Sequence, residues 1–280
     1  MNSIIFDTKS LTPSNVICNK RNSIQYITKV IFSKLFFISF ASSLVYASTP
    51  LCYKEAYPEY IISADEHFIS FQNGTKLPYT TTITKSTWLE KLNNADLKMQ
   101  LSQNYPKNKI STSPTYLFDP GRLRYQPFFS EMYGKNKPAI ETNLVKIDWQ
   151  TSTGIKKILV SKINNIDQKL IQISKEIANL PVHIKQWADN PATYYYRTIK
   201  DTNRLSMHSY GIAIDLSPSK TEYWKNEATD ELVNLDYHNS MPLEIVSIFE
   251  KYGFIWGGRW YHYDTMHFEY RPELLAPSCQ

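Results

Sequence analysis

Six aliphatic side chains recur at intervals of three and four residues between positions 163 and 180, and a proline follows at position 181. On an α-helix this spacing places all six on one face, and proline ends the helix because it cannot continue the hydrogen-bond ladder. An apolar face of this length needs another layer of structure to cover it. The residues of the face are Ile163, Ile166, Leu170, Ile173, Ile177 and Leu180.

The segments around this helix alternate in the manner of strands. Residues 142–149 and 156–161 flank a turn at Thr153-Gly154 and predict a hairpin. The later elements predicted are an extended aromatic segment at 181–198, a strand at 212–216, a short helix at 242–252, and a closing pair of strands at 254–260 and 266–270. This order predicts the α+β class, with a small antiparallel sheet and flanking helices.

Residues 48–113 differ in composition from the rest of the chain, because they are rich in Thr, Ser, Asn and Tyr. Short strand-like pieces occur at 60–62 and 67–71, and a helical stretch is expected around 88–101. We interpret 48–113 as an N-terminal extension of unknown role. The following residues, 114–276, are expected to form one compact domain.

The first 47 residues have the features of an export signal. An apolar run at 35–45 is preceded by Lys29 and Lys34 and followed by the small residue Ala47. This order is typical of a secretory signal peptide, and we expect cleavage after Ala47. The uninterrupted apolar part is shorter than the ~20 residues that span a bilayer. The sequence therefore predicts a secreted or periplasmic protein of the cell envelope, without a stable membrane anchor after signal cleavage.

The net charge of +5 has the same origin. Five of the 31 basic residues and only one of the 26 acids lie within residues 1–47. The remainder of the chain is nearly neutral, so its charge gives no support for binding to nucleic acid. Cys52 and Cys279 stand near opposite ends of that remainder. Two interpretations stay open for them, a disulfide formed in an oxidising compartment and two isolated buried thiols.

Two short segments join a histidine to a carboxylate, in a chain with only six histidines. Residues 204–215 contain His208 and Asp215, and residues 260–269 contain His267. Zinc in hydrolases usually has three protein ligands of the His, Asp or Glu type and a fourth position open to water. His208, Asp215 and His267 supply that set, so the sequence predicts a Zn²⁺ site.

The local sequence explains how these groups could converge. On a strand at 212–216, Asp215 faces away from the core side chains and toward a cleft. His208 has the opposite parity, and Gly211 can supply the bend that brings it to the same side. Asp264 lies just upstream of the last ligand, across a turn. A carboxylate beside the metal is where a general base is needed.

These two segments, with Ile-Trp-Gly-Gly at 255–258 and Tyr-Arg-Pro-Glu-Leu at 270–274, resemble the zinc D-alanyl-D-alanine carboxypeptidase family. That family includes the vancomycin-resistance D,D-peptidases and phage L-alanyl-D-glutamate endopeptidases. The likeness extends from about 119 to 275. It implies a hedgehog/D,D-peptidase-like fold with the zinc site in a cleft, and it makes 114–276 the catalytic domain.

The resemblance also implies roles for single residues. It gives the same three zinc ligands as the spacing does, and it makes Asp264 the catalytic base. Arg197 matches the arginine that polarises the scissile carbonyl and stabilises the oxyanion, with Arg204 as a less favoured substitute. Ser206 matches a residue that helps to hold substrate. Together these residues imply peptide hydrolysis by zinc-activated water.

The expected function is that of a zinc-dependent peptidase acting on peptidoglycan stem peptides, in first place a D-alanyl-D-alanine carboxypeptidase. One alternative is an L-alanyl-D-glutamate endopeptidase of the same family. The other is a non-catalytic zinc-containing module that binds the cell wall, against which the presence of both Asp264 and Arg197 argues. We expect a monomer whose partners are peptidoglycan peptides.

Several other residues near the motif have two interpretations. His262 is either a hydrogen-bonding partner of the site or part of an aromatic surface strand. Glu269 is either a partner of a zinc ligand or an acid at the rim, and it could replace Asp215 on the metal. His183 and His238 are expected to be structural or exposed. The nearby aromatic residues either line the cleft or belong to the core, and they are Trp256, Trp260, Tyr261 and Tyr263.

Overall fold

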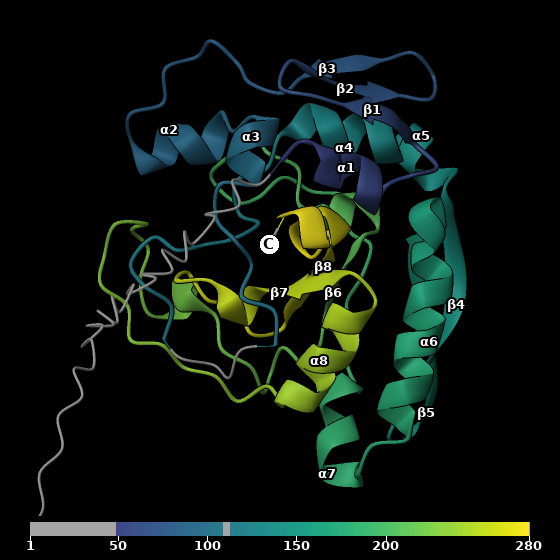
Figure 1. Ribbon diagram of the computed structural model, residues 1–280. Helices are drawn as coiled ribbons and strands as arrows, with labels where there is room; N and C mark the ends of the chain where they lie inside the picture. The colour runs from purple at the N-terminus through teal and green to yellow at the C-terminus, as the bar shows by residue number, and fades with distance from the viewer. Residues whose placement is uncertain (1–48, 109–112, 280) are drawn as a thin grey trace, which may run out of the picture. The chain divides into compact units, whose positions relative to one another are not determined.

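The described part of the chain folds into three small antiparallel sheets with helices around them (Figure 1). The computed structural model describes residues 49–108 and 113–279. These residues belong to one compact unit that spans 44–280, and the predicted signal peptide at 1–47 lies outside the described residues. The mixture of helices and antiparallel strands agrees with the predicted α+β class.

The sheet that carries the site has the strand order β6-β8-β7. Its strands are β6 (Ala213–Asp215), β7 (Phe254–Trp256) and β8 (His267–Tyr270), and all neighbours are antiparallel. Helix α8 (Leu243–Lys251) covers one face, where Phe249 stacks on Phe268 with ring centroids 4.1 Å apart. Three strands of only three or four residues form a stable sheet because their core face is fully buried.

The predicted hairpin and its helix form a second layer. Strands β4 (Leu144–Thr151) and β5 (Gly154–Ser161) pair along their whole length. Helix α6 (Ile166–Ala178) packs on β4 and buries four of the six residues of the predicted apolar face, whereas Ile163 and Leu180 lie outside the helix and are partly buried. The helix is shorter than its periodicity suggested, because Asn164 and Asn165 adopt left-handed conformations within the preceding 3₁₀ turn.

The N-terminal part of the described chain adds the third sheet, in the order β1-β2-β3. Its strands are β1 (Ile61–Ala64), β2 (Phe68–Phe71) and β3 (Lys76–Pro78). The remaining helices are α1 (Leu51–Ala56), α2 (Trp88–Asn93), α3 (Leu97–Gln100), α4 (Gln126–Tyr133), α5 (Lys137–Glu141) and α7 (Val182–Lys185).

The predicted N-terminal extension is tied closely to the C-terminal part. Cys52 and Cys279 form a disulfide, which decides between the two interpretations of these cysteines. The Tyr57 hydroxyl donates to Glu273 at 2.6 Å, and the Tyr105 hydroxyl donates to Glu250 at 2.7 Å. Residues 49–108 therefore share the core of the following domain.

Three sequence-based boundaries need correction. The segment 181–198, expected to be extended, begins with α7 and a 3₁₀ turn at Gln186–Ala188, and only isolated bridges involve its later residues. The stretch expected to be one helix at 88–101 is two, because Asp96 caps a new helix by accepting from the Met99 amide. The strand expected at 254–260 ends at Trp256, where the consecutive glycines 257 and 258 form a 3₁₀ turn.

Among the residues described, no helix combines the length and the apolar character needed to cross a membrane.

Candidate active site

Two neighbouring strands bring two of the predicted zinc ligands together. Asp215 ends β6 and His267 begins β8, and the two residues are direct partners in the antiparallel register. Side chains of such a pair project from the same face of the sheet at close range. The His267 Nδ1 and Asp215 Oδ1 atoms are accordingly 2.9 Å apart. Phe268, on the opposite face, lies in the core as its alternation predicts.

The third predicted ligand comes from a 3₁₀ turn rather than a strand. The turn spans Met207–Tyr210, and Ser206 begins it by accepting a hydrogen bond from the His208 amide at 3.3 Å. Gly211 ends it with a φ of 69°, a left-handed conformation that suits glycine. The bend expected at Gly211 is therefore present, and it turns the imidazole toward Asp215.

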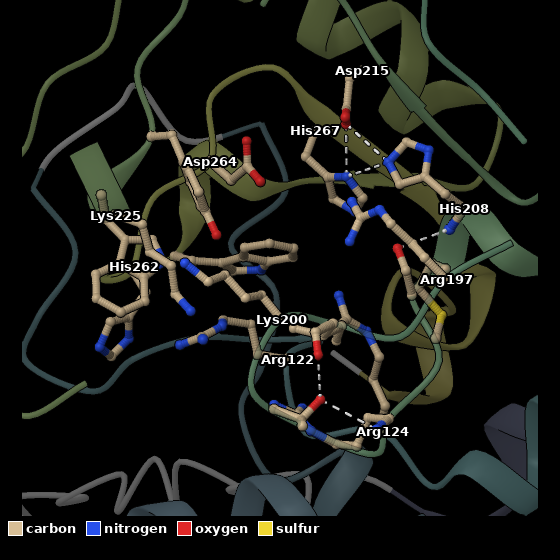
Figure 2. A pocket seen from close by; sticks show the side chains of 18 of the residues that line it. Arg122, Arg124, Arg197, Lys200, His208, Asp215, Lys225, His262, Asp264 and His267 are labelled. Atoms are coloured by element: carbon tan, nitrogen blue, oxygen red, sulfur yellow. Dashed lines mark hydrogen bonds and ion pairs between the residues drawn. The ribbon is translucent and has the colours of Figure 1, made fainter. Parts of the chain in front are cut away.

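The three side chains converge on one point, as Figure 2 shows. Their ligand atoms all lie within 4.8 Å of one another. The His208 Nε2 atom is 3.1 Å from Asp215 Oδ1 and 3.3 Å from His267 Nδ1. Two ring nitrogens and one carboxylate oxygen facing a common point form a donor set that suits zinc.

The outward nitrogen of each ring is also held in place. His208 Nδ1 contacts the carbonyl oxygen of Thr193 at 2.7 Å, and His267 Nε2 contacts Glu269 Oε2 at 3.0 Å. When the outward nitrogen carries the proton, the inward nitrogen of a neutral ring presents its lone pair to the shared point. The residues present therefore fit a zinc ion in both identity and orientation.

Glu269 belongs to a buried chain of charges behind His267. Its side chain is fully buried and accepts from Arg124 Nη2 at 2.5 Å and from Arg271 Nη1 at 2.9 Å. Burial alone would raise the pKa of Glu269, but these two arginines and His267 lower it well below its usual range. Glu269 is thus a permanent carboxylate that orients His267, and it is not a rim acid.

The protonation of His267 follows from the same neighbours. Burial lowers the pKa of His267, but hydrogen bonds to Asp215 and Glu269 outweigh it and raise the pKa to about 10. The charges and hydrogen bonds of the two histidines lower the pKa of Asp215, against the effect of burial. A metal that binds here must displace the proton between His267 and Asp215, so its uptake releases a proton.

Asp264 lies at the edge of this set, held by a tight turn. Its amide donates to the Gly257 carbonyl at 3.1 Å, and its carbonyl accepts from the His267 amide at 3.1 Å. A side chain at position 257 would come within 2.5 Å of the Asp264 carbonyl oxygen, which explains the glycine there. Figure 2 shows the Asp264 carboxyl group beside the three converging residues.

The electrostatic surroundings of Asp264 differ from those of Asp215. Its Oδ1 atom is buried and has no hydrogen-bond partner among the described residues. Burial, together with the negative charge of Asp215, raises the pKa of Asp264 to about 7. A carboxyl group with a pKa near neutrality can both accept and return a proton at physiological pH.

The polar residues predicted to contact substrate line a cavity of about 130 Å³, which the candidate ligands and Asp264 also line. Arg197, Arg204 and Ser206 all contribute to its wall, as do Asp264 and the three candidate ligands. Arg197 is exposed, whereas Arg204 and Ser206 are buried. The structure thus brings together all the residues for which the sequence suggested a direct role.

His262 also lines the cavity, but its ring nitrogens contact other residues than the candidate ligands. Its Nδ1 contacts Asp119 Oδ2 at 2.6 Å, and its Nε2 contacts the Glu231 carbonyl oxygen at 2.8 Å. Both ring nitrogens are therefore occupied by Asp119 and Glu231, and neither contacts a candidate ligand. The ring is fully buried and touches the edge of Trp224. It fastens the loop around Glu231 to the rest of the fold.

The other residues with two interpretations divide between core and cavity. Trp256 and Tyr263 are fully buried, and Trp256 stacks with Phe268 in the core. Trp260 lines the cavity, whereas Tyr261 packs edge-on against Tyr116. His238 lies at the surface, where its Nε2 is 3.8 Å from a Glu227 oxygen and its ring is edge-on to Tyr263, and His183 is also exposed.

Sequence reasoning missed part of the cavity wall. The residues missed include Arg122, Arg124, Lys200, Tyr223, Trp224 and Lys225. They come from two separate loops and from the 3₁₀ helix Trp224–Asn226 with its N-cap Tyr223, and they have no common spacing. Only the Asp-Pro-Gly-Arg run at 119–122 gave a signal, because it marked the beginning of the resemblance.

Comparisons with known proteins support the chemistry that this geometry suggests. Residues 200–270 match the family model described as D-alanyl-D-alanine carboxypeptidase. The match includes the three candidate ligands and Asp264, and Arg197 lies just before it. Comparisons with curated proteins and with solved structures gave no match. At the level of the family, the site-bearing segment is therefore similar to the D-alanyl-D-alanine carboxypeptidases, which are zinc-dependent peptidases.

Proposed function

We propose that this protein is a secreted or periplasmic zinc metallopeptidase that hydrolyses peptidoglycan stem peptides as a D-alanyl-D-alanine carboxypeptidase. The observation that carries the proposal is the convergence of His208, Asp215 and His267 within 4.8 Å, beside a carboxyl group whose pKa is raised to about 7. The family match at 200–270 supports the same activity.

The residues of the site divide the work of hydrolysis. A zinc ion held by the three ligands would supply a positive charge that polarises a peptide carbonyl and acidifies water. Asp264 accepts the proton of the attacking water and returns it to the leaving amine. Arg197 places its guanidinium group at the same cavity and stabilises the negative charge that develops on the carbonyl oxygen.

The surroundings of the protein follow from its other features. The export-signal pattern of residues 1–47 and the disulfide between Cys52 and Cys279 support a location in the oxidising cell envelope. Peptidoglycan peptides are available there. We propose that the protein acts on them as a monomer that has no stable membrane anchor after signal cleavage.

Digestion of peptidoglycan fragments tests this function. Zinc-loaded protein is incubated with purified muropeptides that carry pentapeptide stems, and the products are analysed by mass spectrometry. We expect the loss of one alanine from each pentapeptide. Release of whole stem peptides would instead identify an L-alanyl-D-glutamate endopeptidase. The absence of any new amine, with undiminished binding of an Asp264→Ala variant to cell wall, would identify a binding module.

A further inference from the structure

The cavity beside the candidate ligands is lined by more cations than acids. Six basic side chains contribute to its wall, namely Arg122, Arg124, Arg197, Lys200, Arg204 and Lys225. The wall contains three carboxylates, of which Asp215 is a candidate zinc ligand and Asp264 the proposed base. A wall of this composition attracts an anion.

Two of the arginines already have counter-charges. Arg122 donates to Glu231 at 2.9 Å and to Asp119 at 3.2 Å. Arg124 donates to Glu269, the residue that also holds His267. These two guanidinium groups are parts of the protein's own ion-pair network and therefore do not need a ligand.

Arg204 differs from both. Its side chain takes part in no ion pair or hydrogen bond with the described residues, and its Nε atom is buried without a partner. Only 9% of the residue is exposed. Leaving a buried guanidinium group without a counter-charge is costly, because its lost hydration is not replaced. Such a cost is typical of a group that is reserved for a ligand.

The backbone holds Arg204 firmly at the cavity. Its amide donates to the Thr202 hydroxyl at 3.2 Å, and its carbonyl accepts from the Ile199 amide at 2.8 Å. Ser206 and His208 follow on the same short segment. Burial, with repulsion from Arg124 and Arg122, lowers the pKa of Arg204 to about 10, which leaves it charged at neutral pH.

We propose that Arg204 binds the free α-carboxylate of the substrate's last residue. The proposal rests on the proposed function, since a carboxypeptidase cuts one residue away from that carboxylate. The planar guanidinium fork pairs with a carboxylate through two parallel hydrogen bonds. A carboxylate at Arg204 would neutralise the unpaired cation and place the neighbouring peptide bond toward the three ligands. The preferred substrates are therefore peptides with an unmodified C-terminus.

The test compares two synthetic peptides that end in D-Ala-D-Ala, one with a free C-terminal acid and one with a C-terminal amide. We expect wild-type protein to hydrolyse the acid with a kcat/KM about 10- to 100-fold above that for the amide, as for the loss of one charged hydrogen-bonded pair. Arg204→Met should lower kcat/KM for the acid by that factor, mainly through KM. The same variant should change kcat/KM for the amide peptide by no more than about threefold, because the amide has no terminal carboxylate to be bound.

Two further variants separate binding from other roles. Arg204→Lys keeps the charge without the fork and should give an intermediate value for the acid. Arg197→Met should lower the hydrolysis of acid and amide by equal factors, because its proposed partner is the carbonyl oxygen. If Arg204→Met also lowers kcat/KM for the acid and the amide by equal factors, Arg204 does not bind the α-carboxylate and the proposal is wrong.

Thermal unfolding of the metal-free protein adds a readout without catalysis. Replacing an unpaired buried cation with methionine removes a desolvation cost, so Arg204→Met should unfold at the same or a higher temperature than wild type. A structural arginine would show a lower unfolding temperature instead. That result, joined to an equal loss on both peptides, would assign Arg204 to folding.

Binding measurements keep this proposal separate from the proposed function. Zinc-loaded Asp264→Asn is titrated with the acid and amide peptides by calorimetry, with and without the Arg204→Met change. If wild type cleaves neither peptide but the acid still binds more tightly through Arg204, the proposed function fails and the subsite stands. If Arg204 instead discriminates L-Ala-D-Glu peptides from their D-isoglutamine forms, it binds an internal carboxylate, and the assignment to the C-terminus is overturned.

Discussion

The carboxyl group of Asp264 has surroundings unlike those of Asp215, although both belong to one site. Asp215 lies between two imidazoles that favour its charged form, whereas Asp264 has a buried oxygen to which no described residue donates a hydrogen bond. This contrast separates a group suited to hold a cation from a group suited to exchange a proton. The difference arises from neighbours far apart in sequence.

Replacement of Asp264 by asparagine tests this separation. We expect Asp264→Asn to retain zinc at the wild-type ratio, because the three ligands are untouched, and to lose kcat by about 10²- to 10⁴-fold, the usual contribution of a general base. Metal analysis and steady-state kinetics measure the two effects. His208→Ala is the matched control and should lose both zinc and activity. Loss of zinc from Asp264→Asn would show that Asp264 is a ligand.

The pH dependence of the free energy of unfolding tests the raised pKa of Asp264. In the metal-free protein the pKa of Asp264 is raised to about 7, compared with ~3.9 in an unfolded chain. Between these values the unfolded chain loses a proton that the folded chain keeps, so wild type becomes less stable relative to Asp264→Asn as pH rises. The difference should be smallest below pH ~4 and level off above pH ~7. Urea denaturation with a chelator present measures it, and parallel curves would contradict the raised pKa.

At the scale of elements, the 3₁₀ turn at Met207–Tyr210 decides where His208 points. The turn ends at Gly211, whose carbonyl accepts from the Ser161 amide at 2.9 Å and so fastens the turn to β5. A side chain at position 211 would lie 2.5 Å from Leu144 Cδ2 and 3.0 Å from the Ser161 nitrogen. Glycine is therefore favoured at position 211 for two reasons, the left-handed backbone conformation and the close contact with Leu144 and Ser161.

Gly211→Ala tests how strongly this turn determines the site. We expect a loss of about 3–5 kcal/mol in the free energy of unfolding, from the left-handed φ and the overpacked contact. We also expect weaker zinc binding, because His208 shares the displaced turn. Chemical denaturation and a competitive zinc titration provide the measurements. Unchanged zinc affinity in the folded variant would mean that the turn adapts without moving His208.

Gly74 provides a matched control at the same scale. It also has a positive φ, of 87°, but nothing lies within 4 Å of an added side chain. Gly74→Ala should cost only the conformational strain, about 1–2 kcal/mol, and should not affect zinc binding. The comparison separates backbone strain from contact at the site.

Local patterns predicted some elements better than others. Alternation and apolar periodicity gave β4, β5, α6 and α8 nearly correctly, because these elements bury one regular face. The segment 181–198 was misjudged because its aromatic residues suggested a strand, whereas Pro181 begins a short helix. Here the contacts of the folded chain outweigh intrinsic strand propensity.

At the scale of the whole molecule, the disulfide joins residues that are 227 positions apart. Beside it, the Tyr57 hydroxyl donates to Glu273, which in turn pairs with Arg271 at 2.5 Å. Arg271 also pairs with Glu269, the partner of His267. A continuous series of buried polar contacts thus connects Tyr57, the C-cap residue of α1, to the site.

Removal of both cysteines tests what the disulfide contributes. We expect the free energy of unfolding of the Cys52→Ser, Cys279→Ser double variant to be about 2–5 kcal/mol lower than that of wild type, because the unfolded chain gains conformational entropy. Its kcat/KM should remain within about twofold of wild type while it is folded, because the polar contacts of α1 persist. Denaturation and kinetics at low temperature test both parts. A large loss of activity in folded protein would show that the disulfide itself shapes the site.

The sequence by itself determined the donor atoms and their approximate order. Histidine and carboxylate residues at fixed spacing on short strands restrict the chemistry, since few other side chains bind zinc and exchange protons. The alternation of Phe268 between His267 and Glu269 likewise determined which side chains face the site. These properties depend on residues close together in the chain.

Only the tertiary structure decided which charges surround those donors. Arg124 pairs with Glu269, 145 positions away, and His262 pairs with Asp119, 143 positions away. The side chain of Arg204 has no partner among the described residues. Burial and charge act through space over a few ångströms, whatever the separation along the chain. For this reason the candidate ligands could be proposed from short motifs, whereas the pKa of Asp264 and the lack of a partner for Arg204 among the described residues required the folded molecule.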